Sequence, residues 1–143
     1  PSTFLSPNPN SPRWDFTRFT PDIVSICLGT NDFSDGDGSV PRAPFDPALF
    51  IPAYVDFIKT VHGYYPEARI IITNTPMLDG QKNEILMDCL QQIKTKAEAS
   101  LPGLKPMYLF SFSSVYRSGC LGHPSVEEHG KMAEEFLDFL EGI

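Results

Sequence analysis

Two short motifs in the chain carry residue types that suit acyl transfer. The motif "GTND" (residues 29–32) contains Asn31, and the motif "GCLGHPS" (residues 119–125) contains His123. An asparagine amide donates two hydrogen bonds, which suits the stabilisation of a developing oxyanion. An imidazole takes up and returns a proton at neutral pH. We therefore consider Asn31 an oxyanion donor and His123 a general base in a candidate hydrolase site.

The elements that must position these motifs alternate along the chain. Three short apolar runs predict strands, and three segments with apolar residues at three- and four-residue spacing predict helices. In chain order these are a strand at 22–29, a helix at 45–66, a strand at 68–76, a helix at 80–103, a strand at 105–112 and a helix that begins after Ser125. The alternation predicts an α/β domain with a parallel sheet. Each motif follows a strand at the edge where such sheets bind ligands.

Several local features follow from spacing and residue type. Pro52 is expected in the first turn of its helix, and Ser125 with Glu128 matches the pattern of a capping box. Cys27 lies in a near-continuous apolar run, which suits a strand covered on both faces and therefore a buried thiol. His129 shares the apolar face of the last helix, so we expect a buried structural histidine.

The segments around the two motifs resemble the conserved blocks of a known group of enzymes. "PDIVSICLGTNDFS" resembles the third block of SGNH-type (GDSL-like) hydrolases, and "GCLGHPSVEEHGKMAEEF" resembles their last block. The flanking segments "WDFTRFTPDIVSICLGTND" and "YVDFIKTVHGYYPEARIIITNTPML" are similar to carbohydrate esterase family 2, which removes acetyl groups from plant polysaccharides. The resemblance extends from about Trp14 to the end of the chain.

This resemblance implies a fold and a domain organisation. The fold would be the C-terminal part of a three-layer α/β/α, flavodoxin-like parallel sheet, as in SGNH hydrolases. Residues 1–20 would be an irregular lead-in rich in Pro, Ser and Asn, and residues 21–143 the C-terminal part of one SGNH domain. The implied enzyme is a serine acetylesterase without a metal or organic cofactor. Its implied partner is an acetylated carbohydrate, and its implied location is extracellular.

The resemblance also implies roles for particular residues. Asn31 would be the side-chain oxyanion donor and His123 the base that activates a serine. Trp14 is a candidate for stacking on a sugar ring or for anchoring a loop, and Asp32 for contacting substrate or completing the turn.

The chain departs from the family pattern in two ways. It contains no Gly-Asp-Ser block, so we expect the nucleophilic serine to lie on a segment upstream of Pro1. The Asp that commonly precedes the histidine is also absent, because Cys120 and Leu121 occupy those positions. The expected arrangement is a Ser-His dyad with a backbone carbonyl on the imidazole, or a weakened enzyme.

Other interpretations remain open at this point. A non-catalytic or degenerate carbohydrate-binding member of the same fold is the main alternative. Three further hypotheses are less favoured. One is a zinc site made of Cys120, His123 and His129, and another is a calcium site made of the aspartates of residues 32–37. The third is a nucleophile at Ser113 or Ser114. A net charge of -7 argues against a nucleic-acid partner, and no apolar run has the length of a membrane span.

Overall fold

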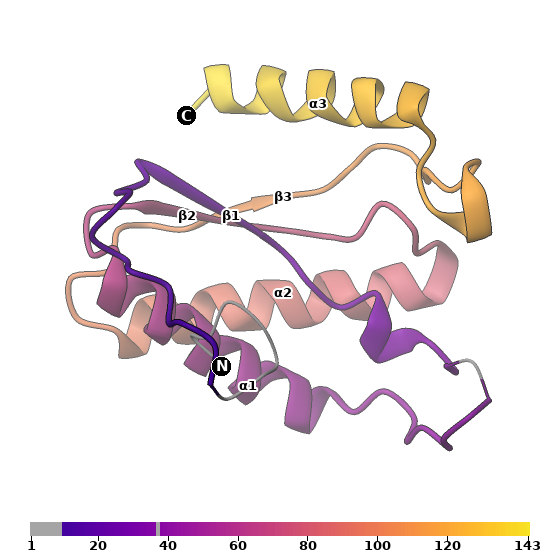
Figure 1. The fold of residues 1–143 in the computed structure, drawn as a ribbon, viewed down its shortest axis with the longest axis horizontal. Coiled ribbons are helices and arrows are strands. Elements are labelled where there is room, and N and C mark those ends of the chain that lie inside the picture. The colour runs from indigo at the N-terminus through magenta and orange to yellow at the C-terminus, as the bar shows by residue number, and fades with distance from the viewer. Residues whose placement is uncertain (1–9, 37) are drawn as a thin grey trace.

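The computed structural model describes residues 10–36 and 38–143. The described residues form a three-stranded sheet in the order β1-β2-β3, three α-helices and two short 3-10 turns. The elements are β1 (Ile23–Cys27), η1 (Asn31–Phe33), α1 (Pro47–Tyr64), β2 (Arg69–Thr73), α2 (Gly80–Ser100), β3 (Tyr108–Phe110), η2 (Cys120–Gly122) and α3 (Val126–Glu141). Helices α1 and α2 cover one face of the sheet and α3 lies over the other (Figure 1), so the predicted α/β/α layering is confirmed.

All three strands run in the same direction. Ile26 of β1 pairs with Ile72 of β2, which in turn pairs with Leu109 of β3, both in parallel register. Because the strands are parallel, their carboxyl ends lie at one edge of the sheet and their amino ends at the opposite edge. The loops that carry both predicted motifs therefore leave from the same edge, which we call the carboxyl edge.

The main hydrophobic core lies between the sheet and the α1/α2 layer. Six fully buried aliphatic side chains belong to it, none more than 1% exposed: Ile58, Ile70, Ile72, Leu86, Leu90 and Ile93. Each such burial contributes about 1.5–3 kcal/mol. The hydroxyl of Tyr54 donates to the carbonyl oxygen of Ile26 over 3.3 Å, which satisfies the polar end of a buried ring. This core fixes the position of the sheet under α1 and α2.

The opposite face of the sheet is covered only in part. The rings of α3 pack over β3, with Phe136 and Phe139 both about 5 Å from Phe110 between ring centroids. No residue of α3 is fully buried. Cys27, which we predicted to be buried, is exposed on this face. The prediction was wrong because an apolar run shows what a strand can bury, whereas the position of α3 over β3 leaves β1 without cover.

Helix ends and helix faces differ from the predictions in two further respects. Asp46 caps α1 by accepting a hydrogen bond from the Ala48 N–H over 2.8 Å, and Pro47 is the first helical residue. Pro52 therefore lies in the second turn, not the first. His129 is exposed instead of buried, because α3 lies over β3 and leaves this part of the helix open.

No helix in the described part of the chain is long and apolar enough to cross a bilayer.

Candidate functional site

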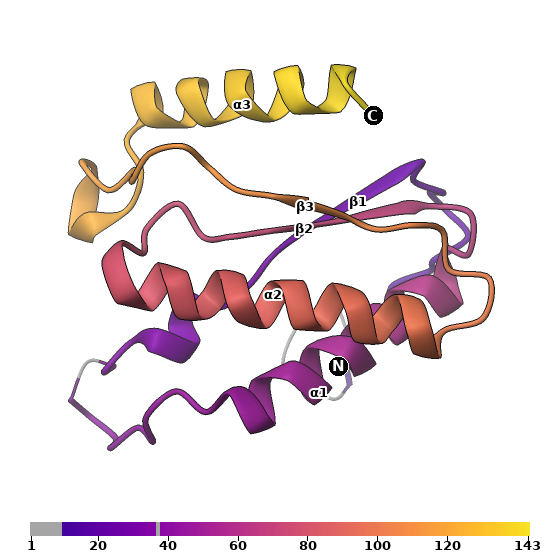
Figure 2. The same ribbon diagram turned by 180° about the vertical axis from the view of Figure 1, so that it is seen from behind.

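The two predicted catalytic side chains lie at the carboxyl edge. Asn31 opens η1, four residues beyond β1, and His123 directly follows η2 in the long connection from β3 to α3. Both views of the fold show the two turns at the same end of the sheet, the end from which α3 starts (Figures 1 and 2). The parallel sheet thus places at one end two residues that are more than ninety positions apart in the sequence.

The "GTND" turn is held by its backbone and by its neighbours. Gly29 has a φ of 124°, and a Cβ there would lie 2.8 Å from Cδ1 of Leu86, so only glycine fits. The Thr30 hydroxyl donates to the Thr75 hydroxyl over 2.6 Å, which ties the turn to the end of β2. Arg42 donates to the Asn31 carbonyl oxygen over 3.0 Å. Within the described structure the Asn31 side chain is exposed and makes no hydrogen bond, so its amide is available to a ligand.

Two surface grooves border this turn. One of about 450 Å³ is lined by Asn31, Asp32, Arg42 and Phe45 among others. A second of about 410 Å³ shares Asp32 and Arg42 and extends to Lys82. Asp32 lies at the junction of both grooves, so the structure brings this predicted substrate-binding residue next to the predicted oxyanion donor.

The loop that carries His123 closes on itself through its backbone. Gly119 N–H donates to the His123 carbonyl oxygen over 2.7 Å, and His123 N–H donates to the Cys120 carbonyl oxygen over 3.1 Å. A Cβ on Gly119 would lie 2.8 Å from the His123 carbonyl oxygen and 2.9 Å from that of Pro124. The short contact across the loop therefore requires glycine at position 119.

The imidazole of His123 is exposed, and in the described structure neither of its ring nitrogens has a hydrogen-bond partner. Among the described residues, the hydrogen bonds that hold His123 are those of its loop backbone, and the predicted Ser-His dyad stays a prediction.

Comparison with known proteins shows what the whole chain is similar to. An acetylxylan esterase / glucomannan deacetylase of Cellvibrio japonicus is 30% identical over 135 residues, which are 93% of this chain and 34% of the relative. The structure of a family two carbohydrate esterase from the same organism superposes with a TM-score of 0.81 at 28% identity, covering 98% of this chain and 38% of that one. The chain is a relative of the family 2 carbohydrate esterases.

A second solved relative gives the same result. A family two carbohydrate esterase from Clostridium thermocellum, in complex with cellohexaose, superposes with a TM-score of 0.75 at 31% identity. The superposition covers 91% of this chain and 38% of the chain of the relative. The chain thus spans about a third of the length of the family 2 relatives it matches. No protein-family model matches the chain.

Trp14 lies away from the other predicted site residues. Two positions further along, Phe16 stacks on Tyr64 with ring centroids 3.6 Å apart. Tyr64 ends α1, and α1 leads into the amino end of β2. Trp14 is thus at the opposite end of the sheet from Asn31 and His123, and the structure does not bring it into their site. The Trp14 side chain is 40% exposed, and both predicted roles of the indole stay predictions.

The other candidate sites gain no support from the structure. Among the described residues no three His, Cys, Asp or Glu side chains gather as a metal site would require. Asp32 and Asp35 are exposed, as expected of a solvated turn, and Asp37 lies outside the described residues. Ser113 is bound through its backbone N–H to Glu135 over 2.8 Å.

Two groups of residues at this edge escaped the sequence analysis. Asn74, 3% exposed, accepts from the Phe112 N–H over 2.9 Å and donates from its side chain to Asn83 over 3.1 Å. It thereby joins β2 to the segment after β3 and to α2. An Asn within the apolar run "IIITNTP" was the available signal, because a buried amide needs several partners.

Two carboxylates of α3 hold the long loop between β3 and α3. Glu135 accepts from the Ser113 N–H and from the Tyr116 hydroxyl, and the latter bond raises the pKa of Tyr116. The second carboxylate, that of Glu128, accepts from the Ser125 N–H over 2.7 Å and from the Ser118 N–H over 2.9 Å. The sequence predicted Glu128 only as part of the capping box, which is confirmed. The signal in the sequence was the seven-residue spacing of Glu128 and Glu135, which places both carboxylates on one face of the helix.

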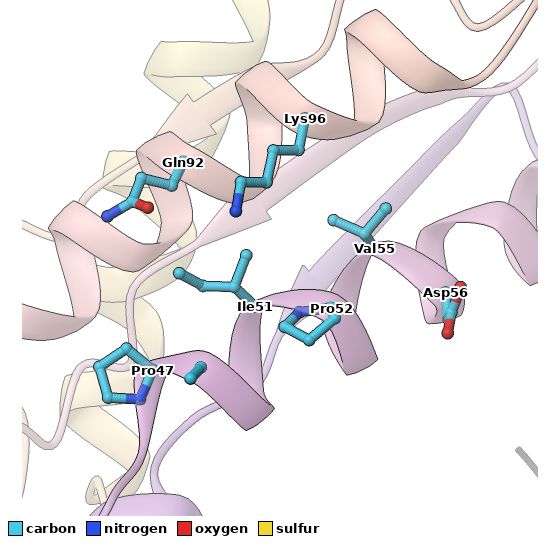
Figure 3. A pocket seen from close by; sticks show the side chains of 8 residues that line it. Pro47, Ile51, Pro52, Val55, Asp56, Gln92 and Lys96 are labelled. Atoms are coloured by element: carbon cyan, nitrogen blue, oxygen red, sulfur yellow. The ribbon is translucent and has the colours of Figure 1, made fainter.

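An open groove of about 610 Å³ between α1 and α2 lies apart from all of these residues (Figure 3). It is lined mainly by Pro47, Ile51, Pro52 and Val55, with Lys96 of α2 extending over it. It contains no nucleophile or imidazole, so we assign it no role in the chemistry of the carboxyl edge.

Proposed function

We propose that this chain is part of a serine esterase of SGNH type that removes acetyl groups from a carbohydrate. The observation that carries the proposal is that an Asn31 amide and a His123 imidazole, neither of them hydrogen-bonded through its side chain among the described residues, lie at the same edge of the sheet in loops held by backbone bonds. The similarity to acetylxylan esterases supports the choice of an acetyl ester. The family's substrates also lead us to propose an extracellular location.

The proposed reaction is acyl transfer in two halves. A serine hydroxyl attacks the acetyl carbonyl carbon while His123 accepts its proton, and Asn31 donates to the oxygen that becomes negative. The tetrahedral intermediate collapses to an acetyl-enzyme, and the sugar hydroxyl leaves with the proton from His123. Water then attacks the acetyl carbonyl carbon while His123 takes its proton, and His123 returns that proton to the serine oxygen as acetate is released. No metal or organic cofactor enters these steps.

We further propose that the serine lies on a segment of the same domain outside this chain. Two features support a docking segment at β1. Strand β1 is at the edge of the sheet, and its Ile23, Ser25 and Cys27 are exposed on the α3 side. A groove of about 280 Å³ runs from Ser25, Cys27 and Thr73 to α3, and the buried Thr73 hydroxyl has no partner in the described structure. A strand beside β1 with a helix in this groove would cover both.

For the carbohydrate, we propose the two grooves beside Asn31 as the binding surface. Asp32 and Arg42 would accept from and donate to sugar hydroxyls there. The complex of the Clostridium thermocellum relative with cellohexaose supports a carbohydrate ligand for this group of proteins.

The test uses the protein as its gene encodes it. Turnover of p-nitrophenyl acetate is measured together with labelling by a fluorophosphonate probe and mass mapping of the labelled serine. We expect labelling on a serine outside this chain and a loss of at least about 1000-fold in kcat for His123→Ala. Unchanged turnover in that variant would remove His123 from the mechanism.

The second candidate function is a carbohydrate-binding protein without catalysis. The specific observation in its favour is that no carboxylate of the described residues bonds to the His123 ring. Binding of cello- or xylo-oligosaccharides without labelling or turnover would favour it. Labelling of a serine by the probe would exclude it.

A further inference from the structure

The loop that carries His123 is closed by one side chain of the helix that follows it. Oε2 of Glu128 accepts from the Ser118 N–H before the loop and from the Ser125 N–H after it, at 2.9 and 2.7 Å. The six intervening residues, 119–124, include His123. A single carboxylate oxygen thus holds both ends of the segment that carries the imidazole.

Other contacts within the loop depend on this closure. Gly119 N–H and the His123 carbonyl oxygen meet at 2.7 Å only if the two ends of the loop stay together. Leu121 has a φ of 54°, a left-handed conformation that a leucine rarely adopts, and its side chain is 93% exposed. The packing of that side chain therefore does not hold the turn. The hydrogen bonds at the two ends of the loop hold it instead.

We propose that Glu128 is a positioning residue for His123, and that it replaces through the loop backbone the orienting acid that the imidazole lacks. This inference rests on the proposed function, since it requires His123 to act as the base. It goes beyond the capping box of α3, in which the Glu128 N–H donates to the Ser125 hydroxyl over 3.2 Å and the Ser125 N–H donates to the Glu128 carboxylate over 2.7 Å. The bond from the Ser118 N–H lies outside this box and closes the loop.

The charge of Glu128 favours this role. The hydrogen bond from the Ser125 backbone, followed by that from Ser118, lowers the pKa of Glu128 to about 2. The carboxylate therefore stays ionised at any pH at which an esterase would work, and charge-assisted bonds to N–H groups are stronger than neutral ones.

The experiment compares four variants of the gene-encoded protein on p-nitrophenyl acetate. Glu128→Ala removes the closure, and Glu128→Gln keeps its shape without the charge. Ser125→Ala removes the cap hydroxyl but leaves both bonds to the carboxylate. Glu127→Gln is the matched surface control, because Glu127 is exposed and pairs only with Lys131 over 2.8 Å.

We expect Glu128→Ala to lower kcat by about 10- to 100-fold with KM changed less than about 3-fold, since a displacement of about 1 Å has such an effect. Glu128→Gln should recover part of the loss. Ser125→Ala and Glu127→Gln should stay within about 3-fold of the parent, although Ser125→Ala lowers the urea midpoint. Exchange of the Ser118 and Gly119 amides, followed by NMR, should accelerate in Glu128→Ala and not in Ser125→Ala.

Three results would overturn the inference. A kcat for Glu128→Ala within 3-fold of the parent, while His123→Ala abolishes turnover, rejects the positioning role and leaves the proposed function intact. Equal losses in Glu128→Ala and Ser125→Ala reduce Glu128 to a helix cap. Unchanged turnover in His123→Ala rejects the proposed function and the positioning role together. If Glu128→Ala does not fold, the kcat of Glu128→Gln decides in the same way.

Discussion

The two faces of the sheet differ in how completely they are covered. On the α1/α2 face, side chains of β1 and β2 such as Ile26 and Ile72 meet two helices, and the cluster around them is fully buried. On the α3 face, one helix lies over β3 and leaves β1 open, with Cys27 exposed and Leu137 of α3 58% exposed. The comparison teaches that the α1/α2 face provides most of the buried core, whereas the α3 face is half-open and lies beside the loop that carries His123.

Thiol labelling gives the largest expected difference between the faces. In the 143-residue chain Cys27 should react readily, whereas Cys89, whose pKa is raised by burial and by the neighbouring charge of Asp88, should react about 1000-fold more slowly because it needs unfolding. Mass mapping after timed alkylation measures both rates. If the gene encodes the proposed docking segment, Cys27 should be protected in the gene-encoded protein; equal labelling in both proteins would contradict that proposal.

The second largest expected difference between the two faces is the loss of stability when one leucine on each face is truncated. Leu90→Ala, at a fully buried site of α2, should lower the free energy of unfolding of the 143-residue chain by about 3 kcal/mol. Leu137→Ala should change it by less than about 0.5 kcal/mol, because more than half of that side chain is exposed. Urea unfolding measures both. Similar losses would mean that α3 packs as tightly as α2.

Removal of a single hydroxyl on the α3 face should have a smaller effect of opposite sign. Thr73 is 2% exposed and its hydroxyl lacks a partner in the described structure. Thr73→Val should therefore stabilise the 143-residue chain by about 1 kcal/mol, since no hydrogen bond is lost. Destabilisation by the same substitution in the gene-encoded protein, but not in the 143-residue chain, would indicate that the proposed docking segment supplies the partner.

The pH dependence of the Glu128 contacts is the smallest expected effect. Because the folded-state pKa of Glu128 is lowered to about 2 from its ordinary 4.5, these contacts stabilise the fold above about pH 4.5 and are lost as the pH falls toward 2. The stability difference between the parent and Glu128→Gln should therefore shrink over this range in urea titrations. A difference independent of pH would show that the charge contributes nothing.

The order of the elements and the edge that carries the motifs followed from the sequence. Periodicity predicts the strands and helices, and the parallel arrangement brings Asn31 and His123 to one edge. The capping box of Ser125 and Glu128 was also predictable, because it depends on residues three positions apart. These features share a cause: each is decided by local sequence or by topology.

What could not be predicted depends on packing between distant segments. Cys27 and His129 carry the pattern of buried residues, and the placement of α3 over β3 leaves both exposed. The bonds of Asn74 to Asn83 and Phe112 need coordinates, since the partners come from different elements. Trp14 joined the site by resemblance alone, and the stacking of nearby Phe16 on Tyr64 holds that segment at the other end of the sheet.

The seven-residue spacing of Glu128 and Glu135 has a consequence for how the chain can vary. The two carboxylates lie two turns apart, about 10 Å along α3, and each holds a different part of the same loop. Insertion or deletion of one residue between them would turn one carboxylate by about 100° away from the loop. Changes of length between the two glutamates should therefore not be tolerated, because one end or the other of the loop that carries the histidine would lose its carboxylate.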